Sequence, residues 1–512
     1  FLFIFFNNIT LTFYNLFFVF IFIVNVLILL SFFINIKKMT VIISSTFAIL
    51  ILAVFISTTP IFHSKDYKNM ILENADTKAV FSKDVTPTDE TKIRLVTKEV
   101  ADVLADKKLW ELWAIWSTTK IWEFSVQKFQ NNIYWFAPLE FRGFWSRISM
   151  KTTPWYVLVS ATNPSDVKII TQVWENKLKL KYLKSSWFFK NIWTHAYIKD
   201  PTKFRTDWTF EVDDEWNPFY AVSIYKPTIW FSWFDVIWVE LIDIQTWIIK
   251  YYPKNEVPKW VDRIEPEEFI DTQLWYYWEY IKWFQWFTQT WKFKPTTWMS
   301  LVFDENENSK WFTSLTSKSA DQSSIWFVLV DTRTKQMTQY QISGATEEAA
   351  MQAAQWKVQQ FKYTATFPTL YNIWWKATYV MSMLDSNKYI KMVALVSVED
   401  ISIVSVWENI WDALIEYKDK INSSWNVFAP DAKVVQQTVT WTISRISDDI
   451  RKWDLYKYIV LENVESKAFV WTSNVSKELL LSKVWDKVTI TYFEWWNKIV
   501  DIQKFDNLDL SF

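Results

Sequence analysis

The sequence predicts an α+β fold of several domains, with N-terminal transmembrane helices, antiparallel sheets and a small C-terminal β-barrel. Three observations point to this class. Residues 1–36 carry no charged side chain. Short runs of alternating apolar and polar residues, typical of strands, dominate the middle of the chain. Five further strand-like runs fill residues 432–512. A chain of 512 residues, half of them hydrophobic, can supply several cores.

Residues 1–60 are predicted to be a membrane anchor of one or two helices. Residues 11–35 are mostly Phe, Leu, Ile and Val, a stretch long enough to cross a bilayer, and residues 40–57 form a second uncharged run. Lys37-Lys38 separates the two runs, and the positive-inside bias places this turn in the cytoplasm. A start at Met39 would instead leave one retained signal anchor. Either way, we expect the bilayer as a partner and the soluble domains outside the cytoplasm.

The remaining residues are predicted to form four domains and a linker. The predicted ranges are an α+β module at 61–205, a β-rich module at 206–344, a helix–meander–helix module at 345–420, a linker at 421–431 and a β-barrel at 432–512. Helical spacing of apolar residues predicts helices at 91–109, 346–360 and 411–420. The linker is polar and contains Ser423-Ser424 and Pro430.

The numbers of Trp and Gly residues are the reverse of those expected for a folded chain. The chain has 37 Trp and 2 Gly, whereas average usage would give about 36 Gly. Several Trp residues lie at turns, among them Trp216, Trp247 and Trp485, and the pairs at 374–375 and 495–496 fill two-residue hairpin slots that normally hold Gly. Some bacterial lineages read the UGA codon as Gly, so we predict that most of these Trp are Gly in the cell.

The alternative is a Trp-rich aromatic binding surface, but such a surface would not concentrate its Trp at hairpin turns. A few Trp residues are predicted to be genuine, with Trp135, in Tyr134-Trp135-Phe136, and Trp260, in Lys259-Trp260-Val261, as the candidates.

Two segments resemble known folds once Gly is assumed. With Gly at 247, residues 219–252 resemble the hairpin of PepSY-type domains, in which a strand pair ends in an Asp-x-x-Thr-Gly turn, here begun by Asp243. Residues 345–420 are similar in order to a PepSY-like or cystatin-like module. With Gly at 441, the strand at 437–446 resembles the opening of an OB-fold or similar five-stranded barrel, where an early Gly lets the first strand bend. The PepSY-like resemblance implies a role in peptidase regulation, and the OB-like resemblance implies nucleic-acid binding.

Few residues offer catalytic or metal chemistry. The chain has no Cys, which excludes disulfides and thiolate catalysis, and only His63 and His195, with His195 expected to be a packed histidine. Asp304 begins a D-x-N-x-N run like a calcium loop, but position twelve is Leu315 rather than Glu, so a polar hairpin is expected. Glu265, Glu267 and Glu268 surround Pro266 and are expected to form a solvated turn or helix start.

Replacing Trp by Gly also creates two misleading motifs. Residues 230–233 would read G-F-S-G, one residue short of a nucleophile elbow. Residues 286–292 would read G-F-T-Q-T-G-K, but Phe293 stands where a phosphate-binding loop needs Ser or Thr.

The sequence therefore predicts a non-enzymatic, membrane-anchored binding or scaffolding protein with no catalytic, cofactor-binding or metal-binding residue. Another protein is the expected partner. Nucleic acid is a less favoured one, because 55 basic residues are balanced by 56 acidic residues.

Overall fold

The computed structural model describes most of the chain beyond residue 59. The described residues are 24, 26, 45–46, 48–49, 51–54, 56, 59–73, 79–80, 85, 88–149, 152–153, 156–173, 176–177, 179–186, 190–229, 233–280, 293–296, 299–303, 308–317, 323–424, 436–451, 454–462, 468–471, 478–493 and 499–510. They form two compact units, Phe1–Trp425 and Asn426–Phe512, called here the first and second units.

The predicted fold class is wrong in its α+β balance and in its transmembrane helices. Strands dominate the structure, so the protein is mostly β, with several antiparallel sheets. A membrane-spanning helix needs about 20 predominantly apolar residues. Within the described residues no helix has that length and apolar character, and α4 (Pro60–Lys68) has nine residues and two lysines in its last turn. The predicted transmembrane helices are therefore absent from the described residues, and most of residues 1–58, where they were expected, lie outside that part of the chain.

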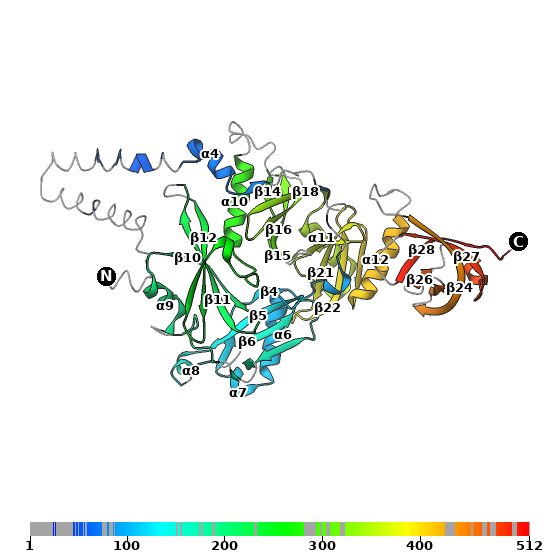
Figure 1. Ribbon diagram of the computed structural model, residues 1–512, viewed down its shortest axis with the longest axis horizontal. Helices are drawn as coiled ribbons and strands as arrows, with labels where there is room; N and C mark the ends of the chain where they lie inside the picture. Colours follow the sequence, from blue (N-terminus) through cyan, green and yellow to red (C-terminus); the bar gives the residue numbers. More distant parts are fainter. Residues whose placement is uncertain are drawn as a thin grey trace. The chain divides into compact units, whose positions relative to one another are not determined.

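Four times along the first unit, a helix is followed by an antiparallel sheet (Figure 1). The helices are α6 (Lys98–Trp110), α9 (Ile192–Lys199), α10 (Glu267–Glu279) and α11 (Glu347–Lys357). The single module predicted at 206–344 instead holds most of the strands of two separate sheets, which are described below as the second and third sheets.

The helix expected at 91–109 begins later, at Lys98. The backbone N–H groups of Leu95 and Val96 both donate to the carbonyl of Ala161, at 2.8 and 2.9 Å. These long-range bonds keep the preceding segment extended, although its apolar residues have helical spacing. Thr97 then precedes α6 in an extended conformation.

The first sheet packs one face against α6. Its strands are β3 (Thr119–Ile121), β4 (Ser125–Phe129), β5 (Asn132–Phe141), β6 (Tyr156–Ser160) and β7 (Val167–Ile170), with β3, β4 and β6 all paired to β5. Trp135, on β5, is buried in this core, and its indole N–H donates to the carbonyl of Val96 at 2.8 Å. Short elements border the sheet: α7 (Trp113–Trp116), α8 (Phe144–Ser149), β8 (Gln172–Val173) and β9 (Asn176–Lys177).

The second and third sheets carry the residues of the candidate site. The second is a four-stranded meander of β10 (Phe204–Val212), β11 (Pro218–Pro227), β12 (Phe234–Asp243) and β13 (Ile249–Pro253). The third contains β14 (Phe293–Pro295), β15 (Ser300–Phe303), β16 (Ser309–Ser317), β17 (Ser323–Asp331) and β18 (Gln336–Ala345), with β1 (Leu72–Glu73) and β2 (Ala79–Val80) parallel to β18.

One turn geometry occurs in both sheets. Between β12 and β13, the carboxylate of Asp243 accepts from the backbone N–H groups of Gln245 and Thr246 at 2.8 and 3.1 Å. Between β17 and β18, Asp331 accepts in the same way from Arg333 and Thr334, at 2.9 and 2.8 Å. The residue after each Thr, Trp247 or Lys335, has a positive φ, of 75° and 60°.

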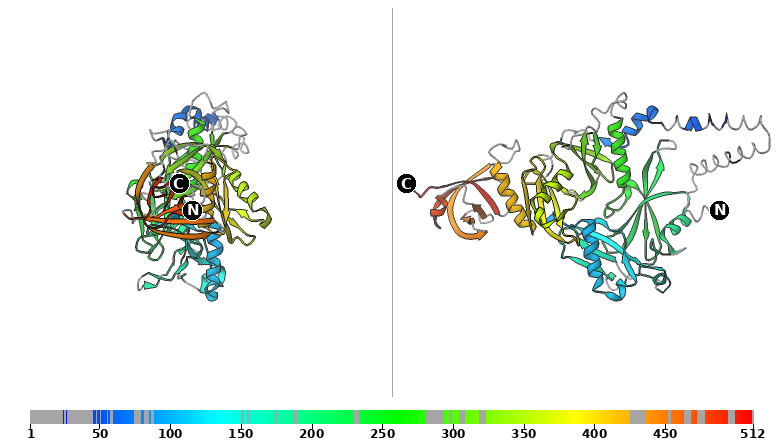
Figure 2. Two further views of the ribbon diagram at one scale, coloured as in Figure 1. Left: turned by 90° about the vertical axis from the view of Figure 1, so that its right-hand side faces the viewer. Right: turned by 180° about the vertical axis from the view of Figure 1, so that it is seen from behind.

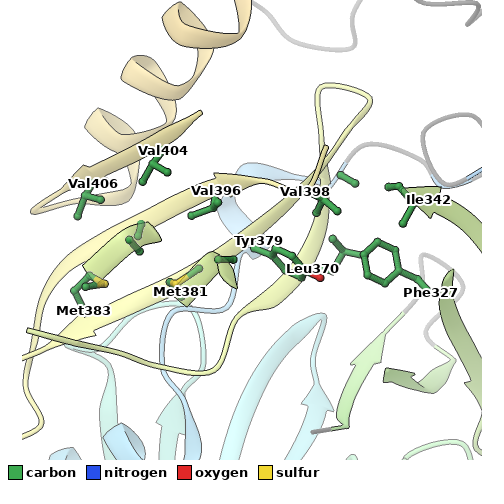
Figure 3. Packing of buried hydrophobic residues seen from close by; sticks show 14 of the residues in the cluster. Phe327, Ile342, Leu370, Tyr379, Met381, Met383, Val396, Val398, Val404 and Val406 are labelled. Carbon is green, nitrogen blue, oxygen red and sulfur yellow. The ribbon is translucent and has the colours of Figure 1, made fainter. Parts of the chain in front are cut away.

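The fourth sheet shares a core with the third. Its strands are β19 (Thr364–Ala365), β20 (Thr369–Ile373), β21 (Lys376–Leu384), β22 (Ile390–Ser397) and β23 (Val404–Trp407), which form the meander predicted within 345–420. Figure 3 shows Tyr379 and Val398 of this region beside Phe327 and Ile342 of the third sheet. The other face packs against α12 (Ile410–Ser424). Gly344 allows the close approach between the two sheets, because a Cβ there would lie 2.3 Å from the carbonyl oxygen of Val398.

The second unit is a closed five-stranded barrel (orange and red in Figure 2). Its strands are β24 (Gln436–Arg451), β25 (Asp454–Leu461), β26 (Ala468–Trp471), β27 (Lys487–Phe493) and β28 (Ile499–Asn507), joined in the order β24-β25-β26-β28-β27. The pair β26–β28 is parallel, and α13 (Glu478–Leu481) lies between β26 and β27 in the chain. The long first strand serves both sides of the barrel, pairing with β27 through residues 436–442 and with β25 from residue 443 onward.

Five Trp residues adopt the left-handed backbone conformation that favours glycine. They are Trp216, Trp247, Trp374, Trp375 and Trp485, with φ between 48° and 81°. The 374–375 pair is a two-residue hairpin turn between the paired residues Ile373 and Lys376, and positive φ at both central positions is the type I′ geometry that selects Asn-Gly or Gly-Gly. These are positions at which the sequence predicts Gly. The pair 495–496 lies outside the described residues.

We expect the protein purified from its own cells to carry Gly at these five positions. Peptide mass spectrometry checks this directly, because each Trp-to-Gly difference lowers the peptide mass by a fixed amount. UGG codons at Trp374 and Trp375 in the gene, or unshifted peptide masses, would contradict the prediction.

Trp485→Gly is expected to stabilise the second unit by about 1 kcal/mol relative to Trp485→Ala. The side chain is 72% exposed, so its removal forfeits little buried area, while φ of 81° strains any residue with a Cβ. Urea unfolding of both variants isolates the backbone effect, since Ala removes the indole but keeps the Cβ. Equal stability of the two variants would show that no strain is stored at this turn.

Candidate functional site

A large cleft of the first unit lies where the second sheet, α10 and β14 meet. Its volume is about 820 Å³, within the range of ligand-binding clefts. The cleft is lined by Thr206, Asp207, Arg263, Pro266, Glu267, Glu268, Asp271, Thr272, Trp275, Lys294, Pro295, Thr296 and Met299. Figure 1 locates the three elements that supply most of these residues, β10, α10 and β14.

Asp207 lies in the wall of the cleft at a bulge in β10. The pairing between β10 and β11 skips this residue, which has φ of 51°. The bulge turns the carboxylate toward Arg263, whose Nε lies 2.7 Å from Asp207 Oδ2. Burial raises the pKa of Asp207, and the guanidinium of Arg263 opposes that shift. Arg263 is further held over the ring of Trp311, 5.1 Å from its centroid.

The first turns of α10 supply three more carboxylates. Pro266 precedes the helix, and Glu267 and Glu268 occupy its first turn, where the positive end of the helix dipole favours acidic side chains. Asp271 follows Glu267 by four residues, so the two acids are neighbours on one face and repel each other. Burial raises the pKa of both groups. Within the described part of the chain, none of these three carboxylates forms an ion pair.

The cleft is therefore acidic overall. Four carboxylates face two cationic side chains, Arg263 and Lys294, which leaves a formal charge of −2. Arg263 is already paired with Asp207. The described residues contain no group of three or more His, Asp or Glu side chains suited to hold a metal ion. The arrangement can accept an organic cation that donates hydrogen bonds to carboxylates.

Two buried carboxyl groups, those of Glu211 and Asp262, lie near the cleft residues Asp207 and Arg263. Glu211, on β10, and Asp262, next to Arg263, are 2% and 4% exposed. The backbone N–H of Asp262 donates to Glu211 Oε2 at 3.1 Å, and Lys128 N–H donates to Asp262 Oδ2 at 2.7 Å. Burial raises the pKa of Glu211 to about 7. Burial, and then the proximity of Glu211, raise the pKa of Asp262.

The residues singled out in the sequence are placed as follows. Glu267 and Glu268 line the cleft, whereas Glu265 is buried and ion-paired with Lys254. His195, on α9, stacks on Trp247 with ring centroids 3.5 Å apart, and burial lowers its pKa. His63 contacts Asp66 at 3.0 Å.

The calcium-loop-like run and the two misleading Trp-to-Gly motifs lie mostly outside the described residues. Leu315 is a buried residue of β16, which pairs with β15 as a hairpin, while residues 304–307 lie outside the described residues. Residues 230–232 and 286–292 also lie outside them.

Asp207, Glu211 and Asp262 were not predicted from the sequence to lie in or near a site. Each is a polar residue in an otherwise ordinary strand or loop, and no local pattern distinguishes it from a solvent-exposed residue.

Comparisons with known proteins identify no family. No family model matches the chain, and no curated protein matches it. Two solved structures show a faint likeness, a mutant of the Synechocystis apocarotenoid oxygenase and an ACO/RPE65 chimera. Both align at 6% identity with a TM-score of 0.14, covering 76% and 75% of this chain. In each case this chain spans 65% of the other, less than two thirds of its length.

Proposed function

We propose that the protein is a non-enzymatic binding protein whose first unit holds a basic segment of a partner protein in the acidic cleft. The observation that carries this proposal is the excess of carboxylates in a cavity of about 820 Å³. Three of them form no ion pair with another described residue, although the charge of Arg263 acts on Glu267. A Lys or Arg side chain entering the cleft would relieve the repulsion between Glu267 and Asp271 and form charge-assisted hydrogen bonds with them.

The test is binding of a fluorescently labelled hexa-arginine peptide to the full chain, followed by anisotropy. We expect the double variant Glu267→Gln/Asp271→Asn to weaken binding about tenfold, with less effect at high salt, where charge interactions are screened. The matched control is Asp214→Asn/Glu215→Gln, which removes the same charge from the turn between β10 and β11. Equal weakening in both variants, or no binding by the unsubstituted protein, would refute the proposal.

The repeated turn supports the PepSY-like resemblance as part of this proposal. Asp243 and Asp331 begin turns with the same hydrogen bonds, each before the last strand of a meander that follows a helix. A role as a peptidase regulator remains a prediction, and capture of one specific protease through the cleft would favour it.

A second candidate is binding of single-stranded nucleic acid by the second unit. The closed barrel, with its shared first strand, supports the OB-like resemblance, and OB barrels bind oligonucleotides. Charge argues against it, because residues 426–512 contain 11 basic and 12 acidic side chains and such binding needs a basic groove. Binding of labelled oligothymidylate that is unaffected by Glu267→Gln/Asp271→Asn would favour this candidate over the first.

A further inference from the structure

Segment 257–263 forms part of the cleft wall but belongs to no helix or strand. It follows the short helix η3 (Lys254–Glu256) and leads through Pro266 into α10. Its last residue, Arg263, lines the cleft and pairs with Asp207. What holds this segment therefore also holds one side of the cleft and the start of α10.

Side chains from three neighbouring elements fix the segment. Arg333, in the β17–β18 turn, donates to the carbonyls of four of its residues, 257, 258, 259 and 261. Gln127, on β4, donates to the carbonyl of Trp260 at 2.8 Å. Thr332 and Ser309 donate to the carbonyl of Asp262. These contacts are all to the backbone, and none of them depends on a charge within the segment.

Two further attachments join the segment to the second sheet: apolar packing of the buried Val257 and Val261, and the buried carboxyl pair. Glu211 accepts from the backbone of Asp262 and from Thr209 Oγ1, the latter at 3.0 Å. No ion pair to either carboxyl group is found in the described part of the chain. Two ionised carboxylates in one buried, hydrogen-bonded site repel each other strongly, so such pairs retain a proton to a higher pH than single carboxyl groups.

The charges that act on the pair come from three elements: Asp207 on β10, Lys128 on β4 and Arg333 in the β17–β18 turn. Arg263, on the segment itself, contributes a backbone hydrogen bond to Glu211. Lys128 and Arg333 favour ionised Asp262, whereas Glu211 disfavours ionised Asp262 and Asp207 disfavours ionised Glu211. Arg263 pairs with Asp207, and Arg333 donates to the four carbonyls while its charge still acts on Glu211 and Asp262.

We propose that Glu211 and Asp262 form a proton-operated latch on segment 257–263. While a proton remains on the pair, the segment is held against β10 and the cleft keeps its shape. When both groups are ionised, the segment separates from β10, Arg263 leaves Asp207, and the cleft wall loosens. The latch regulates the binding site of the proposed function, and only this consequence rests on that function.

Hydrogen exchange of the full chain without ligand tests the latch. After correction for intrinsic exchange, we expect protection of residues 257–263 to fall about tenfold between about pH 6 and about pH 8.5, relative to strands β21 and β22. Glu211→Gln, which mimics the protonated acid, should abolish most of this fall. The control Glu215→Gln, in the exposed turn after β10, should retain it.

An unchanged protection ratio across this pH range, or the same fall in Glu211→Gln, would overturn the proposal. If Glu211→Gln does not fold, Asp262→Asn serves instead. Infrared spectroscopy of the unsubstituted protein at neutral pH gives an independent readout, since the latch requires the carbonyl stretch of a protonated carboxylic acid. Loss of hexa-arginine binding to the cleft would leave these results unchanged, so the latch and the proposed function can fail separately.

Discussion

Trp135→Ala is expected to lower the free energy of unfolding of the first unit by about 4 kcal/mol. The indole is 7% exposed, packs in the core between the first sheet and α6, and donates to the carbonyl of Val96. Its removal creates a large cavity and leaves a buried carbonyl without its partner. Urea unfolding followed by circular dichroism measures the loss.

Trp356→Ala is the matched control for this prediction. Trp356 lies on α11 and is 71% exposed, so the same substitution should change stability by no more than about 0.5 kcal/mol. The contrast separates Trp residues that the core requires from those that it does not. Similar losses at both positions would show that exposure does not decide which Trp residues matter.

The unsubstituted protein is expected to lose about 3 kcal/mol of stability relative to Glu211→Gln as the pH rises from about 4.5 to above 7. The folded-state pKa of Glu211 is raised to about 7 from an ordinary value of 4.5. Below the ordinary value, both folded and unfolded states hold the proton. Between the two values only the folded state holds it, so stability falls with rising pH and is lowest above the folded pKa.

Urea unfolding at several pH values measures this difference. Other carboxyl groups titrate in both proteins, so only the difference between the unsubstituted protein and Glu211→Gln reports on Glu211. A constant difference across the range would mean that Glu211 titrates alike in the folded and unfolded states.

The parts of the fold that depend on local pattern could be predicted from the sequence. The order of apolar runs predicted a meander within 345–420, and the turn slots located the Trp residues with positive φ. The start of α6 could not be predicted, because it depends on hydrogen bonds to Ala161, more than 60 residues away. The transmembrane prediction relied on residues 1–60, where apolar composition alone was used to infer spanning helices.

The sequence predicted no binding site at the cleft, and Glu267 and Glu268 were expected only in a solvated turn or helix start. The acidic start of α10 is visible in the sequence, but its neighbours are not. Asp207 reaches the cleft because β10 bulges, and Glu211 meets Asp262 because two sheets pack with segment 257–263 between them. These contacts join residues that are distant in the sequence, so local sequence patterns do not predict them.

The hydrogen bonds from Arg333 to four carbonyl oxygens also have a consequence for the order of folding. The strands on either side of its turn pair locally and can form early, because closing short loops costs little entropy. Segment 257–263 has no such option, since its carbonyls find their donor only after the β17–β18 turn exists. We therefore expect assembly of the cleft wall to be a late step of folding, in which one guanidinium joins the β17–β18 hairpin to the segment that follows β13.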